Sequence, residues 1–134
     1  MTGLDTGYFI MLLEGNEKAG NIWQSLLDGE DDAVVSCLTL FELERLSLKG
    51  KIARNAMNIL HDGIGAVCLI AWMNDTRILL SGAKLSHSFG TPAMDSLILA
   101  GFKREGVSTI YTTDSDMEKY GHKGVKVINL RRGP

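Results

Sequence analysis

Short apolar runs alternate along the chain with longer segments in which apolar residues recur at helical spacing. The short runs are the expected strands, at residues 2–5, 33–38, 66–70, 108–113 and 125–130. The run at 66–70 has the β-rich content typical of a central strand. This alternation predicts repeated strand–helix–strand units and therefore an α/β fold, a three-layer α/β/α sandwich around a central, mainly parallel sheet of about five strands.

The segments between the strands predict helices. The expected helices are residues 6–15, 17–29, 39–50, 51–63, 75–89, 91–106 and 115–121. Thr91 and Pro92 form a typical helix start, with threonine as the cap and proline in the first helical position. Glycines such as Gly63 and Gly90 are expected to end the helices that precede them.

Size and charge narrow the class of protein. The chain has 134 residues, 45% of them hydrophobic, which suits one domain over residues 1–130 with a loose tail at 131–134. The formal net charge is −2, so no large basic field indicates a nucleic-acid partner by itself. No apolar run approaches the roughly 20 residues of a membrane span, and the N-terminus lacks a signal-peptide pattern. We therefore expect a cytoplasmic protein without membrane contact.

Two kinds of site are disfavoured by the sequence. Cys37 and Cys68 lie in apolar runs, where reduced thiols are expected, and neither has a second cysteine or a histidine at ligand spacing. His61, His87 and His122 are scattered singly, so no zinc pattern can be drawn. A P-loop enzyme is excluded because no GxxxxGK[ST] stretch occurs.

Acidic residues follow the strands, where ligands bind in open parallel sheets. Each has an alternative structural explanation. Asp5 could cap the helix that begins near Thr6, and Glu42 matches a capping box in which it reaches back to the amide of Thr39. Asp95 could complement a helix dipole, but its neighbours at helical spacing are apolar, which predicts partial burial and a need for a cation or a proton.

The stretch "TIYTTDSDM" carries two further acids, Asp114 and Asp116. A second capping box, from Ser115 to Glu118, predicts a helix that starts at Ser115. Asp114 would then have no structural duty, whereas Asp116 would complement the helix dipole. If only one of the two acids is essential for metal binding, we expect it to be Asp114, with Thr112 or Thr113 hydrogen-bonded to a neighbouring carboxylate.

Together, four or five carboxylates at one crevice would repel one another unless a cation were bound. Ligands that are all oxygen favour Mg²⁺ or Mn²⁺, and Mg²⁺ often completes its coordination with substrate phosphate oxygens. A mildly basic rim would suit a nucleic-acid strand. The candidates for that rim are Lys49, Lys51, Arg54, Lys103, Arg104 and Lys119.

The order and context of these acids resemble the PIN-domain ribonucleases, and within them the VapC-like toxins of toxin–antitoxin pairs. The resemblance lies in "LDTGYFI", "SCLTLFELERL", "PAMDSLILAGFKREG" and "TIYTTDSDMEKYG" leading to "VKVIN", and it spans nearly the whole chain. It implies an acidic metal-binding and catalytic set of Asp5, Glu42, Asp95 and Asp114, with Asp116 as an accessory metal-binding acid. It also implies that Thr6 and Thr112 are hydroxyls beside those acids.

The activity implied by this resemblance is hydrolysis of RNA phosphodiester bonds with Mg²⁺ or Mn²⁺, leaving a 5′-phosphate. Asp5, Asp95 and Asp114 are the expected direct ligands, and Glu42 is either a ligand or the group that orients the attacking water. The resemblance further implies a homodimer and a separately encoded antitoxin that lies across the active-site groove. The absence of an appended zinc ribbon or RNA-binding module suits the toxin type.

Alternatives remain open at this point. A PIN nuclease of RNA processing that is not a toxin, a Mg²⁺-dependent phosphatase or receiver-like protein, and a PIN-like domain without catalysis all fit part of the pattern. The first carboxylate lacks the paired acids of a phosphatase motif, and the intact acids argue against lost catalysis. Met117 and Gly7 depart from the residues common in the family, and neither is expected to affect the acids.

Overall fold

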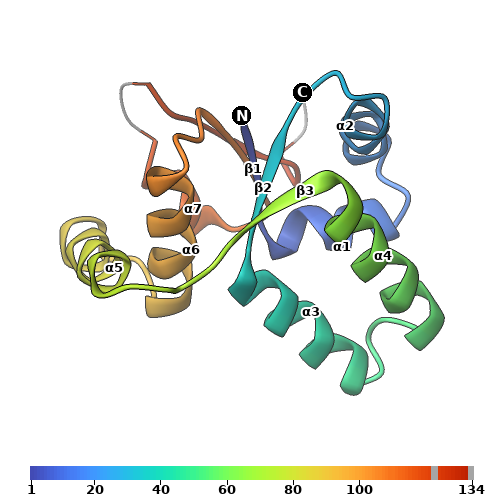
Figure 1. Cartoon of the computed structure of the whole chain (residues 1–134), viewed down its shortest axis with the longest axis horizontal. Coiled ribbons are helices and arrows are strands. Elements are labelled where there is room, and N and C mark those ends of the chain that lie inside the picture. The colour runs from blue at the N-terminus through green and yellow to red at the C-terminus, as the bar shows by residue number, and fades with distance from the viewer. Residues whose placement is uncertain (122–123, 133–134) are drawn as a thin grey trace.

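The computed structural model describes residues 1–121 and 124–132, and its centre is a parallel sheet of five strands (Figure 1). The strand order across the sheet is β3-β2-β1-β4-β5. The strands are β1 (Thr2–Leu4), β2 (Ala33–Ser36), β3 (Cys68–Ala71), β4 (Thr109–Thr112) and β5 (Lys126–Asn129). The predicted α/β fold with a parallel sheet of about five strands is confirmed.

Helices cover both faces of this sheet (Figure 1). They are α1 (Thr6–Leu13), α2 (Glu17–Leu27), α3 (Cys37–Leu48), α4 (Arg54–Val67), α5 (Thr76–Phe89), α6 (Ala93–Arg104) and α7 (Ser115–Glu118). Within the described part of the chain, no helix is both long and apolar enough to cross a bilayer.

Two hydrophobic cores lie on opposite faces of the sheet, because successive strand side chains point to opposite sides. On β2, Ala33 and Val35 pack into the core formed with α1 to α4, whereas Val34 packs into the core formed with α5 to α7. Leu4 and Ile110, both fully buried, divide in the same way between the two cores. The alternation on single strands is what makes the fold three-layered.

The third strand differs from its sequence prediction in position and in bounds. It is an edge strand, not a central one, and Leu69 on it is 48% exposed. Helix α4 does not end at Gly63 but runs on to Val67, so the strand begins at Cys68. A Cβ on Gly63 would lie 3.0 Å from the Trp23 ring, so this glycine permits close helix packing instead of ending the helix.

The described residues include only part of two regions discussed from the sequence. His122 lies outside them, as do residues 133–134 of the expected tail. Arg132, also in that expected tail, bonds to Glu118 on α7. Cys37 and Cys68 are free and half-buried.

Candidate metal centre

The direction in which the chain crosses the sheet reverses at β1. Strands β2 and β3 lie on one side of β1, and β4 and β5 lie on the other, so the crevice between the carboxyl ends of β1 and β4 is a topological switch point. Asp5 directly follows β1, and Thr113 and Asp114 follow β4. The sheet therefore brings together acids that are more than a hundred residues apart in the chain.

Asp5 is buried and has both carboxylate oxygens engaged. It is the N-cap of α1, where Oδ1 accepts a hydrogen bond from the Tyr8 amide at 3.1 Å. Oδ2 accepts a hydrogen bond from the Thr112 hydroxyl at 2.5 Å. The capping role considered from the sequence is thus real, and it coexists with a position on the wall of the crevice.

Glu42 does not take part in the capping box predicted from the sequence. Helix α3 begins at Cys37, with the Ser36 hydroxyl accepting from the Leu38 amide, so Thr39 is already inside the helix. The carboxylate of Glu42 instead accepts a hydrogen bond from the Thr6 hydroxyl at 2.6 Å. The side chain is thereby held toward the start of α1 and the crevice.

Asp114 has the structural duty that the sequence assigned to Ser115. It is the N-cap of α7, and its Oδ1 accepts a hydrogen bond from the Asp116 amide at 2.8 Å. The Asp114 amide donates in turn to the Thr112 hydroxyl at 2.9 Å. The prediction that a capping box frees Asp114 is wrong, because an aspartate at the end of the strand is itself a good cap.

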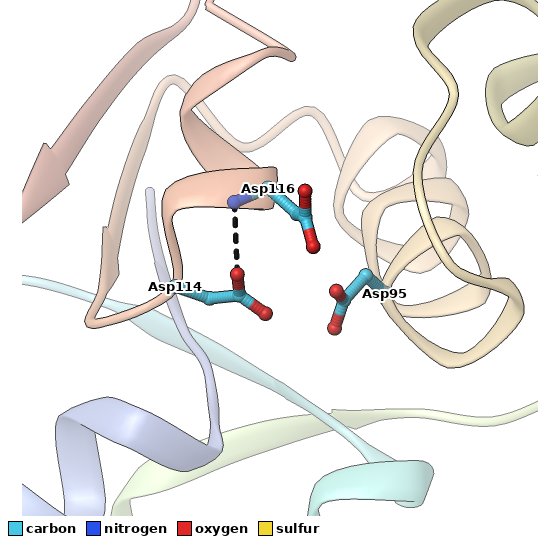
Figure 2. Close-up of side chains that lie close together, drawn as sticks. All are labelled: Asp95, Asp114 and Asp116. Atoms are coloured by element: carbon cyan, nitrogen blue, oxygen red, sulfur yellow. Dashed lines mark hydrogen bonds between the residues drawn. The ribbon is translucent and has the colours of Figure 1, made fainter.

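Three of the acids form a compact cluster on α6 and at the start of α7 (Figure 2). One carboxylate oxygen from each of Asp95, Asp114 and Asp116 lies within 4.8 Å of the other two. The oxygen of Asp114 that does not cap α7 faces Asp95 in Figure 2. Asp5 and Glu42 lie outside this cluster but line the same cavity of about 260 Å³ as Asp95 and Asp114.

The crevice is costly for negative charge. Burial raises the pKa of Asp95 to about 7, and the neighbouring Asp114 and Glu42 raise it as well. Burial also raises the pKa of Asp5 to about 6, against the lowering effect of the Thr112 hydrogen bond. Crowded, partly buried carboxylates with only oxygen donors fit a hard divalent cation, because its charge would relieve this repulsion.

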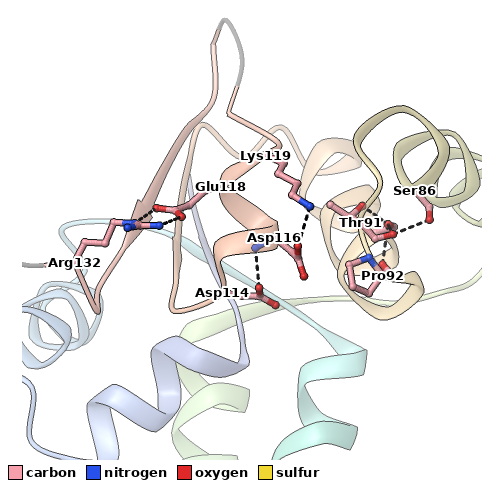
Figure 3. Close-up of polar contacts among 9 residues, drawn as sticks. Ser86, Thr91, Pro92, Asp114, Asp116, Glu118, Lys119 and Arg132 are labelled. Atoms are coloured by element: carbon pink, nitrogen blue, oxygen red, sulfur yellow. Dashed lines mark hydrogen bonds and ion pairs between the residues drawn. The ribbon is translucent and has the colours of Figure 1, made fainter.

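Helix α7 is fixed by ion pairs on both sides of its short length (Figure 3). The Lys119 ammonium lies 3.0 Å from the Asp116 carboxylate. Arg132 forms two hydrogen bonds with Glu118, at 2.6 and 2.7 Å. Asp116 is therefore already partly neutralised, whereas Asp114 has a carboxylate oxygen directed at Asp95.

The predicted basic rim is not what lines the acidic cavity. Arg54 forms a bidentate pair with Glu44, and Lys119 pairs with Asp116. Among the described residues that line the cavity, the basic one is Arg45, which is not one of the rim candidates named from the sequence. Arg45 lies three residues after Glu42 in the same helix, and this spacing in the sequence indicates that the two side chains share a face of the helix.

Comparisons with known proteins show which family model and which solved structures the chain resembles. The model of the PIN domain family matches residues 4–123. None of the curated proteins matches the chain in sequence. Among solved structures, the chain is similar to one in a toxin–antitoxin complex from Klebsiella pneumoniae, with 17% identity, a TM-score of 0.71 and coverage of 97% of this chain and 98% of that one.

Two further structures have the same fold. A chain of the VapBC2 complex of Rickettsia felis, bound to a promoter DNA fragment, has 16% identity, a TM-score of 0.74 and coverage of 96% of this chain and 97% of that one. A chain of the FitAcB structure from Neisseria gonorrhoeae has 22% identity, a TM-score of 0.63 and coverage of 98% and 99%. At these identities, the matches establish a shared fold.

Proposed function

This chain belongs to the PIN-domain family, and on that basis we propose that it is a Mg²⁺- or Mn²⁺-dependent endoribonuclease. The observation that carries the proposal is the convergence of Asp95, Asp114 and Asp116 within 4.8 Å at the switch point of the sheet. A metal site made only of carboxylates, open to a cavity, suits the hydrolysis of phosphodiesters.

The acids divide the work of the site. Asp95 and Asp114 are the proposed principal metal ligands, with Asp116 as an accessory one, and Asp5 contributes negative charge or a ligand oxygen from the cavity wall. A bound Mg²⁺ or Mn²⁺ ion supplies a water of lowered pKa and stabilises negative charge on phosphate oxygens. The protein supplies no covalent nucleophile in this scheme.

Two threonine hydroxyl groups hold the carboxylates of Glu42 and Asp5 in position. The Thr6 hydroxyl holds Glu42 at 2.6 Å, which suits a carboxylate that orients the attacking water or completes the ligand set. The Thr112 hydroxyl joins Asp5 to the loop that carries Asp114. Both contacts reduce the freedom of the carboxylates before substrate arrives, as preorganised sites require.

The proposed biological role is that of the toxin in a toxin–antitoxin pair. The similar solved chains come from a toxin–antitoxin complex and from the VapBC2 and FitAcB structures, which support a protein antitoxin as partner. We also propose that the protein acts as a homodimer. Co-expression with the product of a small adjacent reading frame tests this role, because a cognate antitoxin would copurify with the chain and suppress its activity.

Cleavage of structured and single-stranded RNAs tests the nuclease activity. Purified protein is expected to cut RNA with Mg²⁺ or Mn²⁺, to leave 5′-phosphate ends, and to stop in EDTA. Asp95→Asn should abolish cleavage, whereas Asp62→Asn, the same change at an exposed position on α4, should not. Cleavage that survives both the chelator and the Asp95 substitution would contradict the metal mechanism.

Other activities give different results in the same assay. A phosphatase would release phosphate from phosphomonoesters such as p-nitrophenyl phosphate, and a receiver-like protein would accept a phosphoryl group from acetyl phosphate. A PIN nuclease of RNA processing would cut RNA but would have no antitoxin in the copurification experiment. These outcomes separate the activity from the biological role.

A further inference from the structure

Arg45 is a positively charged residue on the wall of a cavity that is lined mainly by carboxylates among its charged groups. The lining residues include the carboxylates of Asp5, Glu42, Asp95 and Asp114, and Arg45 is the basic side chain among them. It lies on α3, one helical turn beyond Glu42, so the two side chains share a face of the helix. An arginine thus lies on the wall of a site whose other charged residues repel anions.

Arg45 does not serve to neutralise the acids. Across residues 1–121 and 124–132, the ion pairs of the structure join Arg54 to Glu44, Arg104 to Glu105, Lys119 to Asp116 and Arg132 to Glu118. Arg45 takes part in none of these pairs, and its neighbour Glu44 is occupied by Arg54. The exposed guanidinium therefore keeps its hydrogen-bond donors available for a ligand.

The cavity beside Arg45 shares two lining residues with a second cavity. Ile10 and Leu46 line both the acidic cavity and an apolar one of about 570 Å³ between α1, α3 and the start of α4. Leu46 directly follows Arg45 in the chain, so Arg45 lies close to the junction of the two cavities. An extended RNA strand that occupies both cavities would pass Arg45.

We propose that Arg45 binds a backbone phosphate of the RNA next to the one that is cleaved. This inference rests on the proposed nuclease function and adds a substrate-binding residue to it. A polyanion that enters a crevice of four carboxylates is repelled except at the metal, and a second, fixed cation offsets part of that repulsion. The planar guanidinium donates two parallel hydrogen bonds to phosphate oxygens, which fixes the register of the strand as well as its affinity.

Binding of RNA as a function of salt tests the proposal. The probe is a fluorescently labelled, random-sequence, single-stranded RNA, and anisotropy is measured with Mg²⁺ in an Asp114→Asn background to prevent cleavage. Adding Arg45→Ala is expected to weaken binding by about tenfold, or roughly 1.4 kcal/mol. The slope of log affinity against log salt should become shallower by about 0.7, the value for one phosphate contact to a single strand.

Three comparisons make the result specific. Arg45→Lys should restore the salt slope but only part of the affinity, because an ammonium lacks the two-pronged geometry. Arg77→Ala, which removes an exposed arginine from α5, should leave affinity and slope close to those of the background protein. With Asp114 intact, Arg45→Ala should raise KM for RNA cleavage more than it lowers kcat, while the thermal unfolding midpoint stays unchanged.

The outcomes separate this proposal from the function on which it rests. If the wild-type protein cleaves RNA but Arg45→Ala keeps both the affinity and the salt slope of its background, the proposal fails and the nuclease function stands. That result would favour a carboxylate of a protein partner, and not an RNA phosphate, as the group that Arg45 binds. If the protein neither binds nor cleaves RNA, the proposed function fails, and the role of Arg45 fails with it.

Discussion

The hydroxyl of Thr112 donates a 2.5 Å hydrogen bond to the carboxylate of Asp5, which lies 107 residues earlier in the chain. The same hydroxyl accepts a hydrogen bond from the Asp114 amide at 2.9 Å. One buried threonine at the end of β4 thus connects the acid that follows β1 to the loop that carries the metal cluster. The contact joins the central strand pair to the chemistry of the site.

Thr112→Val should damage the site while leaving the shape of the side chain nearly unchanged. The loss of the hydrogen bond to a buried carboxylate is expected to cost about 1–3 kcal/mol in the free energy of unfolding. It should also raise the pKa of Asp5 further, because the Thr112 hydrogen bond lowers it in the native protein. Chemical denaturation and carboxyl-carbon NMR titration measure the two effects. Thr109→Val, at the other end of β4, is the control, and equal effects from both substitutions would contradict the assignment.

The stability of the metal-free protein should fall as pH rises through the titration range of the site. Burial raises the pKa of Asp95 from 3.8 to about 7 and that of Asp5 from 3.8 to about 6. At a pH between the ordinary and the raised pKa of each group, the folded protein holds a proton that the unfolded chain has released. The contribution of both groups to the free energy of unfolding therefore decreases as pH increases. Urea unfolding in EDTA at pH 5 and pH 7.5 measures the difference.

Asp95→Asn isolates the largest part of this pH effect. In EDTA at pH 7.5 the variant should be more stable than the wild-type protein, because it lacks the partly buried negative charge. Added Mg²⁺ should reverse the order by stabilising only the wild-type protein. A wild-type protein that gains stability relative to the variant from pH 5 to pH 7.5 without metal would show that Asp95 is not a charge under repulsion.

The two clustered aspartates after β4 should differ in their contribution to metal affinity. Asp114→Asn keeps a good N-cap for α7 but removes the charge that faces Asp95, so it should weaken Mn²⁺ binding by at least about tenfold. Asp116→Asn should have a smaller effect, because Lys119 already pairs with that carboxylate. Titration calorimetry with Mn²⁺ compares them. A larger loss for Asp116→Asn would reverse the assignment.

Gly7 should be essential to the geometry of the crevice, although it bears no chemistry. A Cβ at this position would lie 2.9 Å from the Cβ of Thr113 and 3.0 Å from its backbone nitrogen. Rotation of the threonine side chain cannot relieve the contact with these two atoms. Gly7→Ala is therefore expected to push away the loop that carries Asp114, to destabilise the protein by about 1–3 kcal/mol and to weaken Mn²⁺ binding.

Gly20→Ala on α2 is the matched control for this substitution. Among the described residues, no atom outside the adjoining backbone of α2 lies within 4 Å of a Cβ at Gly20, so alanine there should stabilise the helix by up to about 1 kcal/mol. If both alanine variants unfold at the same denaturant concentration, Gly7 does not limit the approach of the loop. Local sequence pattern does not reveal this role of Gly7, because the contact with Thr113 joins residues far apart in the chain.

The local pattern of the sequence determined the alternation of strands and helices and the order in which the acids follow the strands. Apolar runs of strand length and the recurrence of apolar residues at helical spacing are local properties, so they could be read from the chain. The sequence also indicated the apolar neighbours of Asp95, and hence its partial burial. It did not determine the order of the strands, which is why β3 was expected at a central position and lies at the edge.

Only the tertiary structure decided which groups donate hydrogen bonds to each carboxylate. Two capping boxes that were consistent with local spacing did not form. Thr6 provides the hydrogen bond for Glu42, and the helix after β4 begins at Ser115 as expected but has Asp114, one residue earlier, as its cap. The engagement of Asp5 by Thr112 and the position of Arg45 on the cavity wall depend on the packing of helices and strands that are distant in sequence. Local spacing identifies the acids, whereas the reversal of strand order at β1 brings them together in space.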